Sequence, residues 1–305
     1  MIKEFNSGVL ILYYHRINDS RKDPFNLCVS PERFEMQISY LAKNYRIVRF
    51  DDSWNYQDKQ IVVTFDDGYA DNLYNALPIL EKYNVPATIF VATGQIMNNK
   101  VMWWDELYEL VVEMNDNNSI KVSDRLFGCE WTTSNYEQKL NCYYAIHKMI
   151  NHYISVETKD RWIEELRQQI GYNIDMHDYA LLTAEELFCL SESKLITIGG
   201  HTLSHMSLGK MNLKEQECEI LENIRQLENI TKKKINVFSY PFGVEDVDCN
   251  QDTISICKQN GITKAATTAQ KLCTLGSNSL LIPRIEVKNW TEKEFIKKIE
   301  EFWTR

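Results

Sequence analysis

The chain has 305 residues and a formal net charge of −9, from 34 Lys and Arg against 43 Asp and Glu. It contains no dense basic run, which argues against a nucleic-acid partner. No apolar stretch approaches the roughly 18 residues that a membrane span needs, so no membrane span is expected. Apolar residues make up 44% of the chain and charged residues 25%, the ordinary balance of a soluble globular protein.

The start of the chain and its cysteines predict a cytoplasmic location. The apolar run at residues 9–14 is too short for the core of a signal peptide, and it leads into charged residues without a small-residue cleavage site. The eight cysteines are scattered and include no CxxC pair. We therefore expect reduced thiols that mostly fill the core.

In the first third of the chain, short β-branched runs alternate with helical periodicity. The predicted strands are residues 9–14 (VLILYY), 46–50, 60–65 (QIVVTF) and 86–91 (PATIFV). A helix is expected after Ser30, which can cap it, with Pro31 at its first position. A second helix is predicted for residues 69–83, ended by Asn84 in a left-handed conformation.

The alternation resumes in the last third of the chain. Strands are predicted for residues 195–199, 236–240, 263–268 and 280–285, and helices for residues 212–230, 252–260 and 291–303. Asn212 followed by Glu215 resembles a capping box at the start of the first of these helices. Seven or eight strand–helix alternations predict an α/β fold, with a parallel sheet closed or nearly closed into a barrel.

Residues 95–190 interrupt this rhythm with a helical, aromatic-rich stretch. We interpret it as a helical insertion within a single barrel domain of residues 1–305, packed beside the barrel. The tryptophans at its start favour packing, and Trp104 is kept as a candidate substrate wall because sugar rings stack on aromatic faces. Three histidines here have no partner at metal spacing and are interpreted as structural, namely His147, His152 and His177.

Two adjacent carboxylates follow the predicted strand at residues 60–65, in the sequence TFDDG. Inside a strand, neighbouring side chains point to opposite faces, but the backbone turns at the strand end and Gly68 permits a tight exit. Asp66 and Asp67 can then both reach the mouth of a barrel, where barrel enzymes place their chemistry. The structural alternative is that Asp67 caps a helix.

Two histidines four residues apart follow another predicted strand, in GGHTLSH at residues 199–205. His201 and His205 would lie on one face of a helical turn, where both imidazoles can hold one cation. The paired glycines would let the backbone approach a ligand closely. A lone histidine is usually structural, but two at this spacing favour a metal site. Two His and one Asp leave positions for water and substrate, as in catalytic zinc sites.

TFDDG followed by HTxxH, in this order on alternating β/α segments, resembles the polysaccharide deacetylase family, the NodB-like carbohydrate esterases. The SYPFG sequence at residues 239–243 is similar to the third motif of that family, and the resemblance covers the chain except the insertion. It implies a distorted (β/α)7 barrel that holds one divalent metal ion, with zinc as the expected metal.

The resemblance also assigns residues position by position. Asp67, His201 and His205 match the metal ligands, and Asp66 matches the catalytic base. Tyr240 matches the residue whose backbone N–H helps to bind the oxyanion. Pro241 and Phe242, from the same motif, are candidate substrate-binding residues.

The chain departs from the family pattern in two places. It lacks the Arg that usually precedes the Pro of the third motif, and no His follows His205. The leaving amine still needs a proton donor. His15, directly after the first strand, is the candidate acid, since a branch acting on poly-N-acetylglucosamine looks similar there; the alternative is a core or capping histidine. Arg284, at the end of the last predicted strand, could pair with Asp66 and hold its carboxylate, with an ordinary surface ion pair as the alternative.

The predicted function is metal-dependent removal of an N-acetyl group from an amino sugar or glycan precursor, with Asp66 as base and His15 as acid. The expected partner is an N-acylated amino sugar made inside the cell for a surface glycan. N-deformylation or cyclic-amide hydrolysis at the same site, or a catalytically inactive glycan-binding barrel, are the alternatives.

Overall fold

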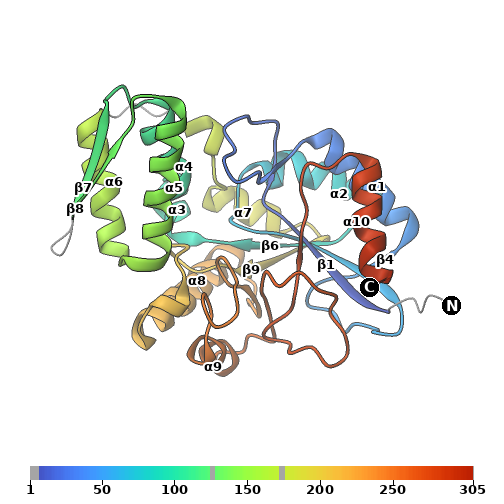
Figure 1. Ribbon diagram of the computed structural model, residues 1–305. Helices are drawn as coiled ribbons and strands as arrows, with labels where there is room; N and C mark the ends of the chain where they lie inside the picture. The colour runs from blue at the N-terminus through green and yellow to red at the C-terminus, as the bar shows by residue number, and fades with distance from the viewer. Residues whose placement is uncertain (1–6, 124–127, 172–175, 305) are drawn as a thin grey trace. The chain divides into compact units, whose positions relative to one another are not determined.

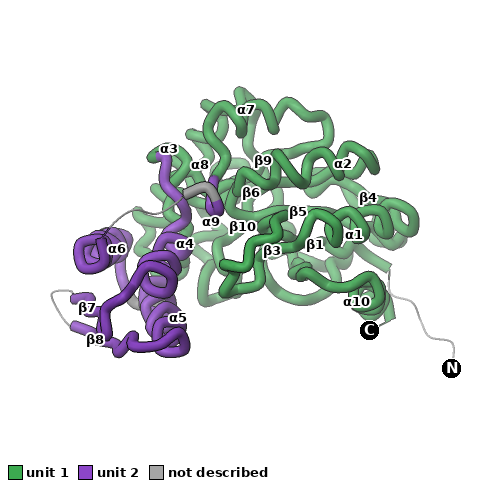
Figure 2. Tube along the Cα trace, turned by 90° about the horizontal axis from the view of Figure 1, so that it is seen from above, with its two compact units in different colours: residues 1–98, 181–305 green, residues 99–180 purple. Residues whose placement is uncertain are grey.

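The computed structural model describes residues 7–123, 128–171 and 176–304 (Figure 1), apart from the side chains of residues 152, 153, 176 and 177. The chain forms two compact units (Figure 2): Met1–Asn98 with Leu181–Arg305, and Asn99–Ala180. The second unit lies within the predicted insertion at residues 95–190, whose place in a single barrel domain stays a prediction. Among the described residues, no helix is both long and apolar enough to span a membrane.

The first unit is built on a curled parallel sheet with the strand order β11-β10-β9-β6-β5-β1-β12, and β4 pairs with β5. The strands are β1 (Gly8–Tyr14), β4 (Arg46–Ile47), β5 (Lys59–Phe65), β6 (Ala87–Val91), β9 (Ile196–Gly200), β10 (Val237–Ser239), β11 (Lys264–Ala266) and β12 (Ile285–Glu286). The segment before β12 bonds back to β11, where the N–H of Thr267 donates to the carbonyl oxygen of Ile282 at 2.8 Å. The predicted distorted α/β barrel is confirmed.

Helices cover the outer face of this sheet (Figure 1). They are α1 (Pro31–Asn44), η1 (Asn72–Ala76), α2 (Leu77–Tyr83), α3 (Thr93–Met97), α7 (Ala184–Ser191), η4 (Leu208–Lys210), α8 (Leu213–Thr231), α9 (Gln251–Gln259) and α10 (Glu292–Thr304). The predicted caps are present: Ser30 accepts a hydrogen bond at the start of α1, and Asn212 forms a capping box with Glu215. Asn84 ends α2 with a φ of 52°.

Alternation along β5 divides the apolar core into two layers. Ile61 and Val63 pack with the apolar faces of the surrounding helices, whereas Val62 packs in a cluster inside the curled sheet. Because the side-chain period of a strand is two, Thr64 and Asp66 continue the inner series. The inward-facing side chains of this strand thus change from apolar to polar towards its carboxyl end.

The second unit combines helices with a two-stranded antiparallel sheet that the helical interpretation missed. Its elements are α4 (Trp103–Tyr108), η2 (Glu109–Glu113), β7 (Ser119–Ser123), β8 (Gly128–Thr132), α5 (Tyr136–Tyr153), α6 (Val156–Ile170) and η3 (Met176–Tyr179). In β7 only Ile120 and Val122 are buried, so the alternating pattern is too short to stand out from the polar residues around it.

The aromatic residues of this unit pack on one another. His147 stacks on Trp103 with ring centroids 4.9 Å apart, which agrees with its structural interpretation. Trp104 is 5% exposed and meets Trp103 edge-on at 5.4 Å, so the packing interpretation of this tryptophan is the one supported. The side chains of His152 and His177 lie outside the described residues.

Several predicted elements have other bounds. β4 covers only Arg46–Ile47, and the helix predicted for residues 69–83 begins as the π-helix η1 at Asn72. The last strand is Ile285–Glu286 rather than residues 280–285, so Arg284 precedes this strand instead of ending it. Pro283 lacks the N–H that a continuous ladder would require, which explains the later start.

Candidate metal and catalytic site

The carboxyl ends of four parallel strands lead into the candidate residues. β1 is followed by His15, β5 by Asp66 and Asp67, β9 by His201 and β10 by Tyr240. Because these strands run in parallel within one sheet, their carboxyl ends open at the same end of the barrel.

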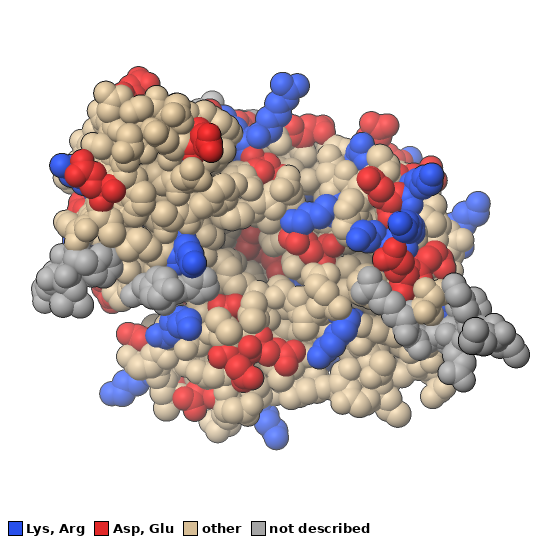
Figure 3. Space-filling model, viewed as in Figure 1, with Lys and Arg blue, Asp and Glu red and all other residues tan. Residues whose placement is uncertain are grey.

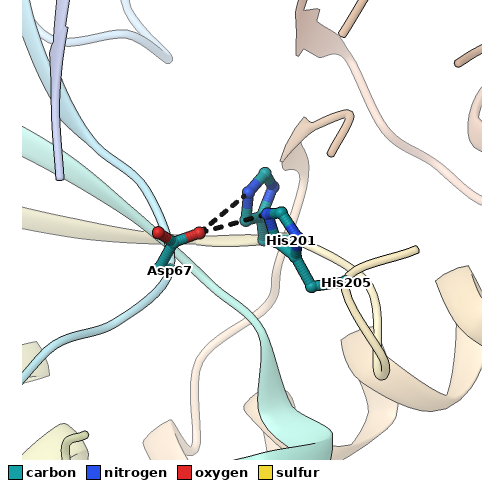
Figure 4. Close-up of side chains that lie close together, drawn as sticks. All are labelled: Asp67, His201 and His205. Carbon is teal, nitrogen blue, oxygen red and sulfur yellow. Dashed lines mark ion pairs between the residues drawn. The ribbon is translucent and has the colours of Figure 1, made fainter. Parts of the chain in front are cut away.

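Asp67, His201 and His205 form a buried cluster whose ligand atoms all lie within 4.8 Å of one another (Figure 4). Asp67 Oδ1 is 3.5 Å from His201 Nε2 and 3.2 Å from His205 Nε2. Figure 4 shows both rings facing the same carboxylate oxygen. The alternative role for Asp67 as a helix cap does not hold, because Asp71 occupies the N-cap position of η1.

This donor set fits a divalent cation. Apart from the two imidazoles, no donor in the described part of the chain bonds the buried Oδ1 of Asp67. His201 Nδ1 lies 2.7 Å from the carbonyl oxygen of Ser239, a contact that places the proton on Nδ1 and leaves the Nε2 lone pair facing Asp67. Two imidazoles and one carboxylate are ligands that catalytic zinc takes.

Left-handed backbone conformations mark the loops of this cluster. The φ angles are 78° at Asp67, 66° at Thr202, 50° at His205 and 60° at Phe242. Asp67 would otherwise point to the opposite face from Asp66, so this turn brings both carboxylates to one mouth. The prediction that His201 and His205 share a helical turn is wrong, because residues 201–205 form an irregular loop with two left-handed residues.

Glycines permit close packing at two points of the site. Gly68 has a φ of 91°, and a Cβ there would lie 2.9 Å from Val91 Cγ1. A Cβ on Gly200 would lie 2.7 Å from Phe238 Cδ2 and 2.8 Å from Asn223 Oδ1. Gly200 therefore lets the backbone approach other parts of the protein, and not a ligand as the sequence suggested.

Helix α8 supports the histidine loop with two polar side chains that sequence reasoning missed. Asn223 Oδ1 accepts a hydrogen bond from the N–H of His201 at 3.0 Å. Glu219 Oε2 accepts hydrogen bonds from the N–H groups of Leu203 and Ser204, each at 2.9 Å. Both residues lie four apart among the buried residues of α8. Their helical spacing beside the apolar stripe of Ile220, Ile224 and Leu227 was the feature that could have identified them.

Asp66 is held by a bidentate ion pair with Arg284, which is 0% exposed. The two N–O distances, Nη1–Oδ1 and Nη2–Oδ2, are both 2.7 Å, and the guanidinium also donates to Ser239 Oγ at 2.8 Å. The predicted pairing is present, and the alternative of a surface ion pair is excluded. Burial opposes ionisation of Asp66, but the charge and the hydrogen bonds of Arg284 outweigh it and hold the pKa of this carboxyl below its usual range.

His15 lies beside this cluster and follows β1 directly. Its ring is half-buried and meets the ring of Tyr13 edge-on, with centroids 5.5 Å apart. It lies within electrostatic range of both Asp66 and Asp67. An imidazole in this position can exchange a proton with a group bound at the mouth of the barrel.

The prediction for Tyr240 is wrong in this structure. Its backbone N–H donates to the carbonyl oxygen of Ala266 at 3.1 Å, within the pairing of β10 with β11, and so is not available to an oxyanion. Its hydroxyl donates to the carbonyl oxygen of Leu280 at 3.0 Å. Of the two residues that follow, Pro241 is buried and Phe242 is half-buried, with its ring 5.1 Å from that of His205.

Charged side chains of both signs lie on the surface of the protein. On the face drawn in Figure 3, the Lys and Arg side chains of the described residues are interspersed with Asp and Glu and form no continuous basic area.

Comparison with known proteins identifies relatives along almost the whole chain. Residues 54–123 and 160–265, more than half of the chain, match the family profile described as polysaccharide deacetylase. A poly-beta-1,6-N-acetyl-D-glucosamine N-deacetylase from Staphylococcus aureus is 22% identical, and the alignment covers 99% of this chain and 86% of the relative.

Solved structures share the fold. IcaB from Ammonifex degensii superposes with a TM-score of 0.61 at 17% identity, and the match covers 99% of each chain. The deacetylase PplD from Streptococcus pyogenes has a TM-score of 0.57 at 17% identity, with 96% of this chain and 99% of that chain covered.

Proposed function

Because the chain belongs to the polysaccharide deacetylase family, we propose that it is a metal-dependent N-deacetylase acting on N-acetylglucosamine residues of a glycan. The observation that carries the proposal is the buried Asp67–His201–His205 cluster beside a carboxylate, Asp66, that Arg284 fixes in place. The name of the Staphylococcus aureus relative favours a polymer of N-acetylglucosamine over a monomeric precursor as the substrate class.

The reaction adds water across an amide. One proton leaves the attacking water, a C–O bond forms, the C–N bond breaks, and the nitrogen takes up a proton to give a free amine and acetate. A divalent cation held by Asp67, His201 and His205 would supply Lewis-acid chemistry, which polarises a carbonyl and makes water more acidic.

Asp66 is suited to accept the proton from water. Its lowered pKa keeps it ionised, and the bidentate pair with Arg284 sets the plane of the carboxylate. Among the described residues, Oδ1 accepts from Arg284 alone and so retains a second lone pair that can accept a proton, whereas Oδ2 also accepts a hydrogen bond from Ser239 Oγ at 3.5 Å.

His15 is suited to donate the proton to the leaving nitrogen. An amide anion is a very poor leaving group, so bond cleavage requires an acid at this point. Because the N–H of Tyr240 is bound to Ala266, this donor does not serve an oxyanion, and charge stabilisation would be supplied by a cation held by Asp67, His201 and His205.

The test uses the full chain, stripped of metal with a chelator and reloaded with zinc, cobalt or nickel. β-1,6-linked N-acetylglucosamine oligomers should yield acetate and free amine in equal amounts, and both should vanish on stripping and return on reloading. N-formyl oligomers are assayed in parallel for formate. Formate without acetate would overturn the acyl assignment, and bound metal without any amine release would favour a glycan-binding barrel.

Asp66→Asn tests the assignment of Asp66 as the base in the same assay. It should lower kcat by about 10²–10⁴-fold, the usual contribution of a general base, with metal content retained. His147→Phe is the control, because a phenyl ring preserves the stack on Trp103 and should leave both readouts unchanged.

A further inference from the structure

A buried asparagine connects the carboxylate segment to the candidate acid. Asn72 is the first residue of η1 and follows Asp67 by five positions. Its side chain is 0% exposed, and its Nδ2 donates to the carbonyl oxygen of His15 at 2.9 Å. The chain segment that carries the base and a metal ligand therefore also holds the backbone of the candidate acid.

Asp71 extends this connection to the next two residues. Its Oδ1 accepts hydrogen bonds from the N–H of Ile17 at 3.0 Å and from Asn72 Nδ2 at 3.1 Å. Its Oδ2 lies 3.4 Å from Arg16 Nε. Asn75 Nδ2 donates to the carbonyl oxygen of Ile17 at 2.7 Å. Residues 15–17 are thus tied to one short segment by several buried or half-buried contacts.

The local structure of this segment departs from ordinary helix design. Asp71 occupies the N-cap position of η1 but makes no capping hydrogen bond, and its carboxylate instead binds the short strand β2 (Arg16–Ile17). The first turn of the helix is a π-helix, a widened turn that is frequent at functional sites. The helix therefore lacks both a capping hydrogen bond and a regular first turn at the point where Asp71, Asn72 and Asn75 bind residues 15–17.

We infer that Asn72 is a positioning residue for His15, held in orientation by Asp71, and that it acts on protonation of the leaving amine. This inference rests on the proposed function. Fixing the His15 backbone leaves only the side-chain torsions to place the imidazole. A misplacement of about 1 Å can cost a reaction roughly 100-fold.

A second asparagine offers a matched comparison. Asn223 is also 0% exposed and also binds the backbone of a histidine of the site, but that histidine is His201, in the metal cluster. Its Nδ2 donates to the carbonyl oxygen of Val91 at 3.0 Å. The same residue type thus supports two different chemical steps from two different helices.

Two substrates separate these steps. Hydrolysis of an N-acetylglucosamine oligomer needs a proton for the amine, whereas hydrolysis of 4-nitrophenyl acetate releases a phenolate that leaves without one. Asn72→Leu should lower kcat on the oligomer about 10–100-fold, with KM and metal content unchanged and ester hydrolysis within about twofold of wild type. His15→Ala should show the same selectivity with a larger loss.

Asn223→Leu should instead lose metal and both activities together. Equal loss on both substrates in Asn72→Leu, loss of its metal, or an unchanged rate on the oligomer would overturn the inference. Asn72→Ser, which is polar but too short to reach His15, provides a second variant if the leucine variant does not fold, and it should show the same selectivity.

A measurement without turnover separates this inference from the proposed function. In protein labelled with ¹⁵N-histidine, Asn72→Leu should shift or broaden the His15 imidazole signals and leave those of His201 in place, with the opposite pattern in Asn223→Leu. Unchanged His15 signals would overturn the positioning role. Wild-type protein that hydrolyses neither substrate would overturn the proposed function and with it the role in amine protonation, whereas the positioning of His15 by Asn72 would still be decided by the imidazole signals.

Discussion

The two ends of the curled sheet handle buried charge in different ways. At the carboxyl end, each buried carboxylate faces nitrogen groups of other side chains: Arg284 forms an ion pair with Asp66, and Asp67 faces two imidazoles. At the amino end, Lys264 begins β11 and its Nζ lies 3.4 Å from the ring centre of Trp54. This ammonium donates to the carbonyl oxygen of Phe50 at 2.9 Å, and burial lowers its pKa to about 8.

This difference indicates that the residues at the carboxyl end are arranged for chemistry at some cost in stability. The carboxyl end carries several ionisable groups together with left-handed, non-glycine residues, whereas at the amino end Lys264, held by carbonyl oxygens and an aromatic ring, lies against the apolar interior. In barrels of this kind, the carboxyl end carries activity and the amino end carries stability. Changes at the carboxyl end should therefore affect metal content and activity, and changes at the amino end should affect stability alone.

The largest effect is expected from His201→Ala. Loss of a ligand should reduce metal affinity by more than the roughly 10–100-fold that removal of an outer partner costs, and deacetylase activity should fall with it. Metal analysis after dialysis and acetate release provide the measurements. A variant that keeps full metal content would show that the cluster is not the cation site.

Arg284→Met should be costly in stability because it leaves the Asp66 carboxylate buried without its partner. We expect a loss of about 3–5 kcal/mol in the free energy of unfolding, measured by urea denaturation. Since burial raises the pKa of Asp66 and the main opposing charge is gone, the acid limb of the pH–rate profile should move to higher pH.

The pH dependence of this loss has a definite sign. Because the pKa of Asp66 is lower in the folded state than in the unfolded chain, this carboxyl stabilises the folded protein at pH values above its unfolded pKa. The contribution disappears as the pH falls through the pKa of the folded state. The stability gap between wild type and Arg284→Met should therefore narrow in acid. Adding Asp66→Asn to Arg284→Met should recover part of the lost stability, and fully additive losses would contradict the coupling of the pair.

Gly68→Ala tests the backbone at the carboxyl end. The new Cβ would meet Val91 Cγ1 at 2.9 Å at a φ of 91°, so we expect a loss of about 1–3 kcal/mol in unfolding free energy together with lower activity. Gly276→Ala is the control, because nothing lies within 4 Å of a Cβ at that position. Equal stability of the two variants would show that the turn tolerates a side chain.

The smallest effect is expected at the amino end, from Lys264→Met. Burial lowers the pKa of Lys264 from 10.5 to about 8, so between these values the unfolded chain binds more protons and wild-type stability gains as pH rises. Lys264→Met should lack this gain, measured as the difference between the two proteins in urea denaturation across that range. The deacetylase activity of this variant should match that of wild type. A loss of activity would contradict the expectation that changes at the amino end affect stability alone.

The positions of the main site residues could be predicted because parallel strands bring their carboxyl ends to one edge. Asp66, Asp67 and His201 each follow a strand that is recognisable from its apolar residues, and the motif order places those strands in one sheet. The pairing of Arg284 with Asp66 was also predictable, since a buried carboxylate needs an opposite charge.

The features that could not be predicted depend on contacts between distant segments. Whether the N–H of Tyr240 is available depends on how β10 pairs with β11, and the motif contains no information on that register. The contacts of Asn72 and Asn223 with histidine backbones likewise depend on which helix face meets which strand end. The loop at residues 201–205 follows its tertiary contacts rather than the helical spacing of its histidines.

The left-handed residues of the histidine loop lower the stability of the backbone at a position that the site requires. Thr202 is β-branched and held at a φ of 66°, a conformation that costs a residue with a Cβ about 1–2 kcal/mol and glycine almost nothing. Glycine would relieve this strain, but it would also remove the buried hydroxyl that accepts a hydrogen bond from the N–H of His205 at 3.1 Å, and so loosen the loop that presents His201 and His205. The hydroxyl of Thr202 thus couples the strained conformation to the placement of a candidate metal ligand, so stabilising substitutions should be sought outside this loop.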